Sequence, residues 1–396
     1  MIKKIKTRRI VPFWGLLLGA LLILSRVSSA FPLYFVASKG EFLNLLKGLY
    51  AQRAENFYVS FLYPVWDPLE EALWGIESLR CVAPYDFWHQ QNYQATALDH
   101  TVYFSLTFRT TYTEERELEE ALAPIIARWH NLSPLEKIVL VHDWIITHLR
   151  YDTSYANYSA FEAFFERRAV CQGYALLAAK MFTLLGIENS LPSGYAGGVP
   201  HLWNMVKLCC GALCTWFHLD ITWDDPLPDG QHSYRYFLLS ENQILLDHYI
   251  EEDCGQTSPL TYQTWQALCT ADKDLAPRLL VNSQAPFVSL KKEDILSLTV
   301  SLDARLSGDG DYFLWVSLPG GEKIWFTLDK GWLISSTPLP AYQGPLISFA
   351  PLEILRLPVK DIPAGTYFLY FAVDDQPDGQ LNPSGTVSEL ILFIPN

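Results

Sequence analysis

The spacing of apolar residues changes along the chain and predicts three kinds of segment. Residues 57–66 and 102–110 alternate between apolar and polar positions, which indicates strands within an N-terminal region of mixed helices and strands. Between residues 133 and 186 the apolar residues recur every three or four positions, which predicts helices. After residue 286 short alternating runs separated by turns predict a β-sandwich.

The helices in the middle of the chain carry clear start and stop signals. Ser133 and Ser159 each begin a capping box, in which a Glu three residues later reaches back to the capping residue. A further apolar helix is expected over residues 172–185, and Gly186 supplies its C-terminal stop. These signals predict where the helices begin and end.

Cys171 stands at the start of this last helix. A cysteine there lies near unpaired N–H groups and the positive end of the helix dipole, which favours the thiolate. Gly173 lets the first turn pack close to another backbone segment. The alternative is that Cys171 is one more buried apolar thiol, which is the commoner case for a cysteine considered alone.

Two aromatic, strand-like runs follow the helix and supply an imidazole and a carboxylate. His201 begins the run at residues 201–206, and Asp220 lies within the run at residues 216–223. Because the connection between the runs is short, we expect them to pair as an antiparallel hairpin. Asp220 would then orient the ring of His201, while the helix presents Cys171 to the other ring nitrogen.

The carboxylate in an apolar strand supports this arrangement, since a buried carboxylate is costly unless it is paired. His218 shares the strand parity of Asp220 and is the rival base, although a histidine on a sheet face is the simpler interpretation. Four nearby polar or aromatic residues are expected to hold the strand ends and the turn rather than to react, namely Asn204, Trp223, Asp224 and Asp225.

Three motifs in this order resemble the bacterial transglutaminase-like superfamily. They read Cys171-Gln-Gly-Tyr-Ala, His201-Leu-Trp-Asn and Leu219-Asp220-Ile-Thr-Trp-Asp-Asp-Pro226, and the resemblance covers residues 133–240. It implies a papain-like α+β fold in which the cysteine helix packs on an antiparallel sheet. It also implies that Cys171 is the nucleophile, His201 the general base and acid, and Asp220 the orienting carboxylate.

Pattern and resemblance together predict four parts. Residues 1–30 are expected to be a signal peptide or membrane anchor, and residues 31–130 a mixed α/β region. Residues 131–275 would form the transglutaminase-like core, and residues 286–396 the β-sandwich accessory domain.

Charge narrows the classes of partner. The formal net charge is −14, and six of the 29 basic residues lie in the first 30 positions, which contain no acid. The remaining 366 residues carry 23 basic and 43 acidic side chains. Such an acidic surface repels phosphate backbones, so we predict no nucleic-acid partner, and membrane association only through the N-terminal segment.

That N-terminal segment has the order of a secretory signal. A basic stretch is followed by an apolar run at residues 11–24 and by small residues at 28–30. An uncleaved anchor is the alternative, because Arg26 is unusual in a cleavage region. We therefore expect an exported protein, either periplasmic, secreted or at the cell surface.

The seven cysteines are odd in number, which suggests one thiol kept free in an exported chain. Cys209, Cys210 and Cys214 lack a second pair at zinc spacing, so a hairpin disulfide or free thiols are expected there. Cys254 and Cys269 have a spacing that would allow a bridge. The acidic run of Asp374, Asp375 and Asp378 indicates a hairpin turn rather than a calcium loop, so no metal or cofactor is predicted.

Two functions from different classes fit the sequence. The first is a cysteine peptidase or acyltransferase that acts on a protein or peptide amide through a Cys171 thioester, with hydrolysis favoured over cross-linking because of the resemblance. The second is a non-catalytic surface protein that binds peptide or glycan. The presence of cysteine, histidine and aspartate together favours the enzyme.

Overall fold

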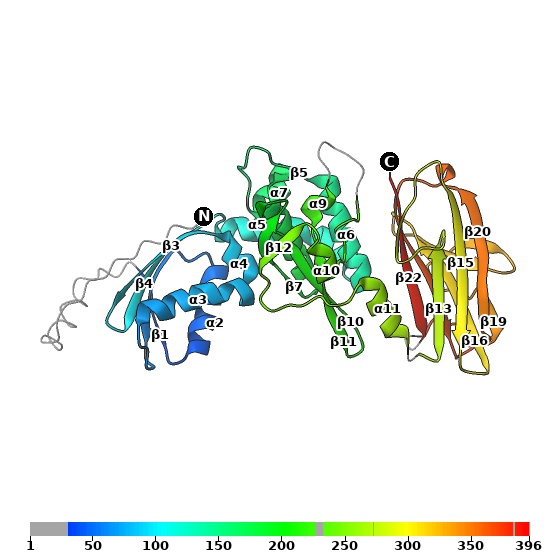
Figure 1. Cartoon of the computed structure of the whole chain (residues 1–396), viewed down its shortest axis with the longest axis horizontal. Helices are drawn as coiled ribbons and strands as arrows, with labels where there is room; N and C mark the ends of the chain where they lie inside the picture. Colours follow the sequence, from blue (N-terminus) through cyan, green and yellow to red (C-terminus); the bar gives the residue numbers. More distant parts are fainter. Residues whose placement is uncertain (1–30, 226–232, 272, 383–384, 396) are drawn as a thin grey trace, which may run out of the picture. The chain divides into compact units, whose positions relative to one another are not determined.

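A computed structural model describes residues 31–225, 233–271, 273–382 and 385–395 (Figure 1). The contacts within it divide the chain into two compact units. The first contains the described residues up to 206 together with 219–222 and 245–257, and the second contains the rest. The expected signal segment, residues 1–30, lies outside the described residues.

The first unit begins with a four-stranded sheet in the order β1-β2-β4-β3, covered on one face by helices (Figure 1). Its buried core is aromatic, with Phe42, Phe57 and Phe104 fully buried. The elements are β1 (Leu33–Val36), α2 (Lys39–Ala51), β2 (Asn56–Phe61), α3 (Pro68–Val82), α4 (Pro84–His89), β3 (Gln90–Leu98) and β4 (Thr101–Phe108). Strands β2 and β4 confirm the alternation seen in the sequence.

Four helices follow in the same unit, and their start signals act as the sequence predicts. Ser133 and Ser159 cap their helices, and in both cases the Glu three residues later completes the capping box. Gly186, just after the last helix, has φ +74°, the left-handed conformation of a helix stop. The helices are α5 (Tyr112–Trp129), α6 (Pro134–His148), α7 (Ala160–Glu166) and α8 (Cys171–Leu184).

The strands after α8 confirm the expected hairpin only in part. The run that begins at His201 divides at Trp203 into two strands, β9 (Val199–Leu202) and β10 (Asn204–Cys210), which belong to different sheets. Strand β9 is the edge of a sheet ordered β12-β8-β9, whose other members are β8 (Ser193–Ala196) and β12 (His248–Glu252).

Strand β10 pairs with β11 (Leu213–Leu219), which is the part of the expected hairpin that forms, and β7 (Asn189–Ser190) lies on its other side. The predicted strand over residues 216–223 is therefore too long, because the chain turns into the short helix α9 (Ile221–Asp224) after Asp220. His218, the rival base, is buried on β11 and pairs through its backbone with Leu239.

The second unit ends in the predicted β-sandwich. A three-stranded sheet, β13-β15-β20, faces a larger sheet in the order β14-β22-β21-β16-β17-β18, with β19 also paired to β16. The smaller sheet contains β13 (Leu275–Val281), β15 (Ile295–Ala304) and β20 (Phe349–Pro358). The larger contains β14 (Phe287–Ser289), β16 (Asp309–Ser317), β17 (Lys323–Thr327), β18 (Gly331–Ile334), β19 (Tyr342–Pro345), β21 (Gly365–Asp374) and β22 (Thr386–Ile394). The α+β fold class with a C-terminal sandwich is thus confirmed.

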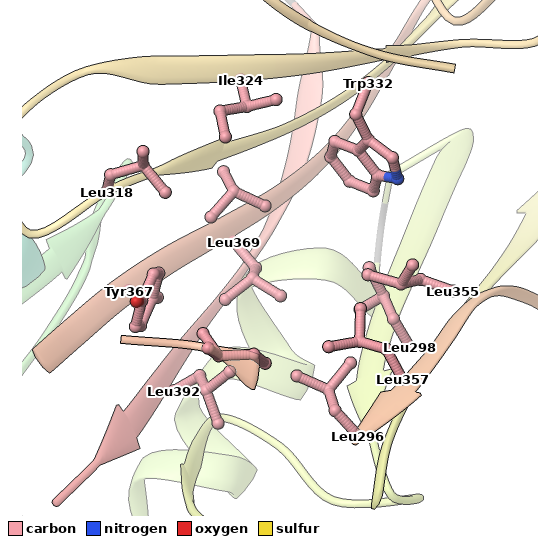
Figure 2. Close-up of a pocket in the computed structure, with 12 residues that line it drawn as sticks. Leu296, Leu298, Leu318, Ile324, Trp332, Leu355, Leu357, Tyr367, Leu369 and Leu392 are labelled. Carbon is pink, nitrogen blue, oxygen red and sulfur yellow. The ribbon is translucent and has the colours of Figure 1, made fainter. Parts of the chain in front are cut away.

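An apolar cavity of about 250 Å³ lies between the two sheets of the sandwich (Figure 2). Its walls carry mainly leucine side chains, with the indole of Trp332 and the ring of Tyr367. The Tyr367 hydroxyl donates to the carbonyl of Pro363, so this polar atom is already engaged. The cavity offers little to the hydroxyl groups of a glycan.

Three disulfides tie the described chain. They are Cys81–Cys254, Cys209–Cys214 and Cys210–Cys269, and Cys171 is the free thiol. The hairpin disulfide was among the expected outcomes, whereas the bridge between Cys254 and Cys269 is wrong. Spacing alone does not identify a partner that lies 173 residues away.

The acidic run near the C-terminus forms a turn, as expected. Asp374 accepts backbone hydrogen bonds from Gln376 and Asn382, and Asp378 accepts one from Gln380. In the part of the chain that the structure describes, no helix has the length and apolar character needed to cross a membrane.

Candidate active site

Cys171 is the first residue of α8, and short-range structure fixes its position. Residues just before it form β6 (Arg168–Ala169), which runs parallel to β5 (Arg150–Tyr151). Gly173 is required in the first turn, because a Cβ there would lie 2.5 Å from that of Ala169 and 3.3 Å from the carbonyl oxygen of Ser159. The thiol is half-buried, so a substrate can reach it.

Asp152, which follows β5, helps to place Cys171. Asp152 is fully buried, and its carboxylate accepts hydrogen bonds from the Ser154 hydroxyl and from the backbone of Ser154, Ala156 and Asn157. The Ser154 hydroxyl first, and then these backbone donors, lower the pKa of Asp152 to about 2. An ionised Asp152 therefore shapes the loop that leads into α7.

His201 and Asp220 lie side by side although they belong to different elements. The Nε2 atom of His201 is 2.8 Å from Oδ2 of Asp220, and both side chains are buried. Asp220 follows β11 directly, and its Oδ1 accepts the backbone N–H of Thr222 at 3.1 Å, which caps α9. The sequence correctly predicted this pair but not the separate sheets that bring it together.

Cys171 joins the pair from the other side of the imidazole. Since Nε2 of His201 faces Asp220, Nδ1 remains for the hydrogen bond with the Cys171 side chain. Burial alone would lower the pKa of His201, but the Asp220 charge and hydrogen bond, together with Cys171, raise it to about 10. Burial likewise opposes ionisation of Asp220, yet its two histidine partners lower its pKa to about 2.

The second of these partners, His248, was not predicted from the sequence. Its Nε2 lies 2.9 Å from Oδ2 of Asp220, the same oxygen that His201 contacts, and its Nδ1 lies 2.7 Å from Oδ1 of Asp247. The ring is fully buried at the start of β12. The sequence around it, Leu-Leu-Asp-His248-Tyr-Ile-Glu-Glu, carries no motif that would indicate this contact.

Trp203 covers both imidazoles. It is among the largest fully buried side chains, and its ring stacks on that of His201 at 5.8 Å with an interplanar angle of 19°. The His248 ring meets the indole edge-on at 5.3 Å. This indole excludes water from the side of the site where the histidines meet Asp220.

Neighbouring residues have structural partners, as expected. Asn204 donates to the carbonyl of Ala175 in α8 at 2.9 Å, and Asp224 accepts the Ser233 hydroxyl and the Tyr236 backbone. Gln172, next to the thiol, donates to the carbonyl of Trp88.

Tyr151 is a different kind of neighbour. Burial, followed by its proximity to Cys171, raises the pKa of Tyr151 to about 12. Its hydroxyl therefore stays protonated beside the thiol and can donate a hydrogen bond.

His201, Asp220 and His248 also have the composition of a metal site, since their ligand atoms lie within 4.8 Å of one another. The two N···O distances of 2.8 and 2.9 Å are those of hydrogen bonds, and one carboxylate oxygen serves both rings. A metal would have to replace both hydrogen bonds. Hydrogen bonding accounts for the arrangement without it.

The middle of the chain is similar to known proteins. The sequence model of the transglutaminase-like superfamily matches residues 124–221, which include all three predicted site residues. Kyphoscoliosis peptidases of Homo sapiens and Mus musculus are 25% identical over 177 residues, or 40% of this chain and 26% of theirs. The chain thus spans about a quarter of the length of these curated relatives.

Among solved structures, a crystal structure of a TGase is 16% identical, covers 51% of this chain and 62% of that one, and superposes with a TM-score of 0.25. The assignment rests on the family match and on the three motifs, the last of which begins within the matched residues and extends beyond them. Residues 124–221 of this chain therefore form a domain of the transglutaminase-like superfamily.

Proposed function

We propose that this chain is an exported cysteine enzyme that transfers the acyl group of an amide through a thioester at Cys171. The observation that carries the proposal is the hydrogen-bonded order of Cys171, His201 and Asp220. Cys171 is also the free thiol among seven cysteines, the other six being in disulfides. A nucleophile, a base and a group that orients the base, in this order, form the arrangement of an acyl-transferring cysteine enzyme.

In the first half of the reaction, the Cys171 thiolate attacks the amide carbonyl carbon and a C–S bond forms. The backbone N–H of Cys171, at the N-terminus of α8, is one donor to the oxyanion. Tyr151 is our candidate for a second donor, because its protonated hydroxyl lies near the thiol. His201 then gives the proton on Nδ1 to the leaving amine as the C–N bond breaks.

In the second half, His201 takes a proton from the acceptor as the acceptor bonds to the thioester carbonyl carbon. The C–S bond then breaks and releases the Cys171 thiolate. Asp220 remains ionised throughout and stabilises the imidazolium. Water as the acceptor gives hydrolysis, and an amine gives cross-linking. We propose hydrolysis, supported by the peptidase name of the relatives.

Export is proposed on two grounds. The N-terminal 30 residues have the order of a signal segment, and disulfides persist in oxidising compartments. The proposed substrate is a protein or peptide, and any membrane association would use only the N-terminal segment.

The competing function is a non-catalytic protein that binds peptide or glycan. The sandwich cavity is apolar, which suits neither a glycan nor the polar backbone of a peptide. The hydrogen-bonded histidine and carboxylate beside a free thiol are unnecessary for binding. Catalysis is therefore the better explanation of the site.

The test is to incubate the protein with a complex peptide mixture and to identify products by mass spectrometry, with and without methylamine. We expect new free carboxylates that disappear in Cys171→Ala. Products that persist in this variant would refute acyl transfer at Cys171. Methylamides in place of carboxylates would refute the preference for hydrolysis.

A further inference from the structure

The carboxylate of Asp220 is shared by two histidines. Its Oδ2 atom lies 2.8 Å from Nε2 of His201 and 2.9 Å from Nε2 of His248. The mechanism uses only the first of these contacts. The second belongs to a residue 28 positions downstream, on another strand.

The sheet β12-β8-β9 explains how the two rings converge. Across the central strand β8, Ala196 pairs with His248 on one side and Gly194 pairs with His201 on the other. Directly paired residues point to the same face, and residues two apart share a face, so both imidazoles project from one side of the sheet. The centroids of the two rings are 5.7 Å apart.

His248 is held from its other nitrogen as well. Nδ1 lies 2.7 Å from Oδ1 of Asp247, and the edge of Trp203 closes the remaining side. An ionised carboxylate only accepts hydrogen bonds, so the contact with Asp220 places hydrogen on Nε2 of His248. The ring is thus fixed as a donor that points at Asp220.

We propose that His248 is a positioning residue of the active site: it holds Asp220 in the orientation that pairs with His201. The proposal rests on the proposed function for its catalytic meaning. Without this donor, Oδ2 of a fully buried carboxylate loses the hydrogen bond from His248, which weakens its orientation toward His201.

The test compares His248→Leu, which removes the donor, with His248→Gln, which keeps an amide donor. His89→Leu is the matched control, because His89 is equally buried in the same unit but bonds to Tyr85 and Ala160 instead of Asp220. Two quantities are measured on each folded protein: the rate of Cys171 alkylation by iodoacetamide from pH 5 to 9, and the ring titration of His201 by ¹⁵N NMR.

We expect His248→Leu to reduce alkylation at pH 6 about tenfold relative to wild type, which is a shift of about one pH unit in the profile. His248→Gln should recover most of this loss, and His89→Leu should lower Tm without moving the profile. An unchanged profile in folded His248→Leu would overturn the proposal. A higher pKa of His201 in His248→Leu than in the wild type would also overturn it. In that case His248 would only compete with His201 for the charge of Asp220.

Two safeguards keep the test decisive. If His248→Leu does not fold, the wild-type NMR spectrum decides, since an Nε2 of His248 without hydrogen contradicts the proposal. If wild-type Cys171 reacts only as an ordinary thiol, the proposed function fails. The His201 titration still reports whether His248 holds Asp220 in place.

Discussion

Replacing Asp220 by Asn should remove most of the proton affinity of His201. The substitution keeps the shape of the side chain and its contact with the Thr222 backbone but deletes the charge. In the wild type the pKa of His201 is raised from 6.5 to about 10, against the effect of burial and because of Asp220 and Cys171. A shift of this size corresponds to about 5 kcal/mol of preference for the imidazolium.

Burial lowers the pKa of His201, and in Asp220→Asn the carboxylate charge no longer opposes this effect. The pKa of His201 should therefore fall to 6.5 or below. The assay is a ¹⁵N NMR titration of histidine-labelled protein. Cys171→Ser in parallel separates the smaller contribution of the thiol. If His201 in Asp220→Asn still titrates more than one unit above 6.5, the carboxylate is not the cause and the reasoning fails.

The raised pKa of His201 should also make the stability of the fold decrease as the pH rises. A group with a raised pKa stabilises the fold fully below its unfolded value, and this contribution is lost as the pH rises through the folded value. The free energy of unfolding of the wild type should therefore fall between pH 6.5 and about 10. Denaturant titrations of Asp220→Asn should show a weaker fall across that window.

Three further perturbations test other parts of the structure. Gly173→Ala should cost about 1–3 kcal/mol of stability by urea unfolding, because the new Cβ meets Ala169 at 2.5 Å. Removal of the Cys81–Cys254 disulfide should cost up to about 5 kcal/mol, since it closes a separation of 173 residues. Burial lowers the pKa of His89 from 6.5 to about 4, so unfolded chains take up its proton first. As the pH falls from 6.5 to about 4, the free energy of unfolding of the wild type should therefore decrease by about 3 kcal/mol, and that of His89→Gln should decrease less.

Each perturbation has a matched control. A Cβ at Gly48, inside α2, meets nothing within 4 Å, so Gly48→Ala should leave stability unchanged or raise it. The disulfide between Cys209 and Cys214 spans only five residues, and its loss should cost about 2 kcal/mol. His130 is exposed, so His130→Gln is the control for replacing a buried histidine. Equal effects in variant and control would contradict the structural reason given for each.

Local chemistry explains what could be predicted from the sequence. The capping boxes at Ser133 and Ser159 and the stop at Gly186 depend on residues within one helical turn. The placement of Cys171 at a helix start follows from those signals. The three motifs then identified the family correctly.

Tertiary contacts explain what could not be predicted. The run at His201 divides at Trp203 because the residues before it pair with β8 and those after it pair with β7 and β11. The ring of Trp203 lies against the two imidazoles. His248 reaches Asp220 through a strand pairing that no local pattern encodes.

The pH dependence of Cys171 alkylation by iodoacetamide, in wild type and in His201→Ala, tests the central claim most directly. Because the other six cysteines are in disulfides, the label reports on this thiol alone. We predict that wild-type labelling persists well below pH 7 and falls by about two orders of magnitude at pH 6 in His201→Ala, since an ordinary thiol ionises near pH 8.5. Labelling that begins only near pH 8.5 in both proteins would contradict a thiolate–imidazolium pair, and with it the enzyme.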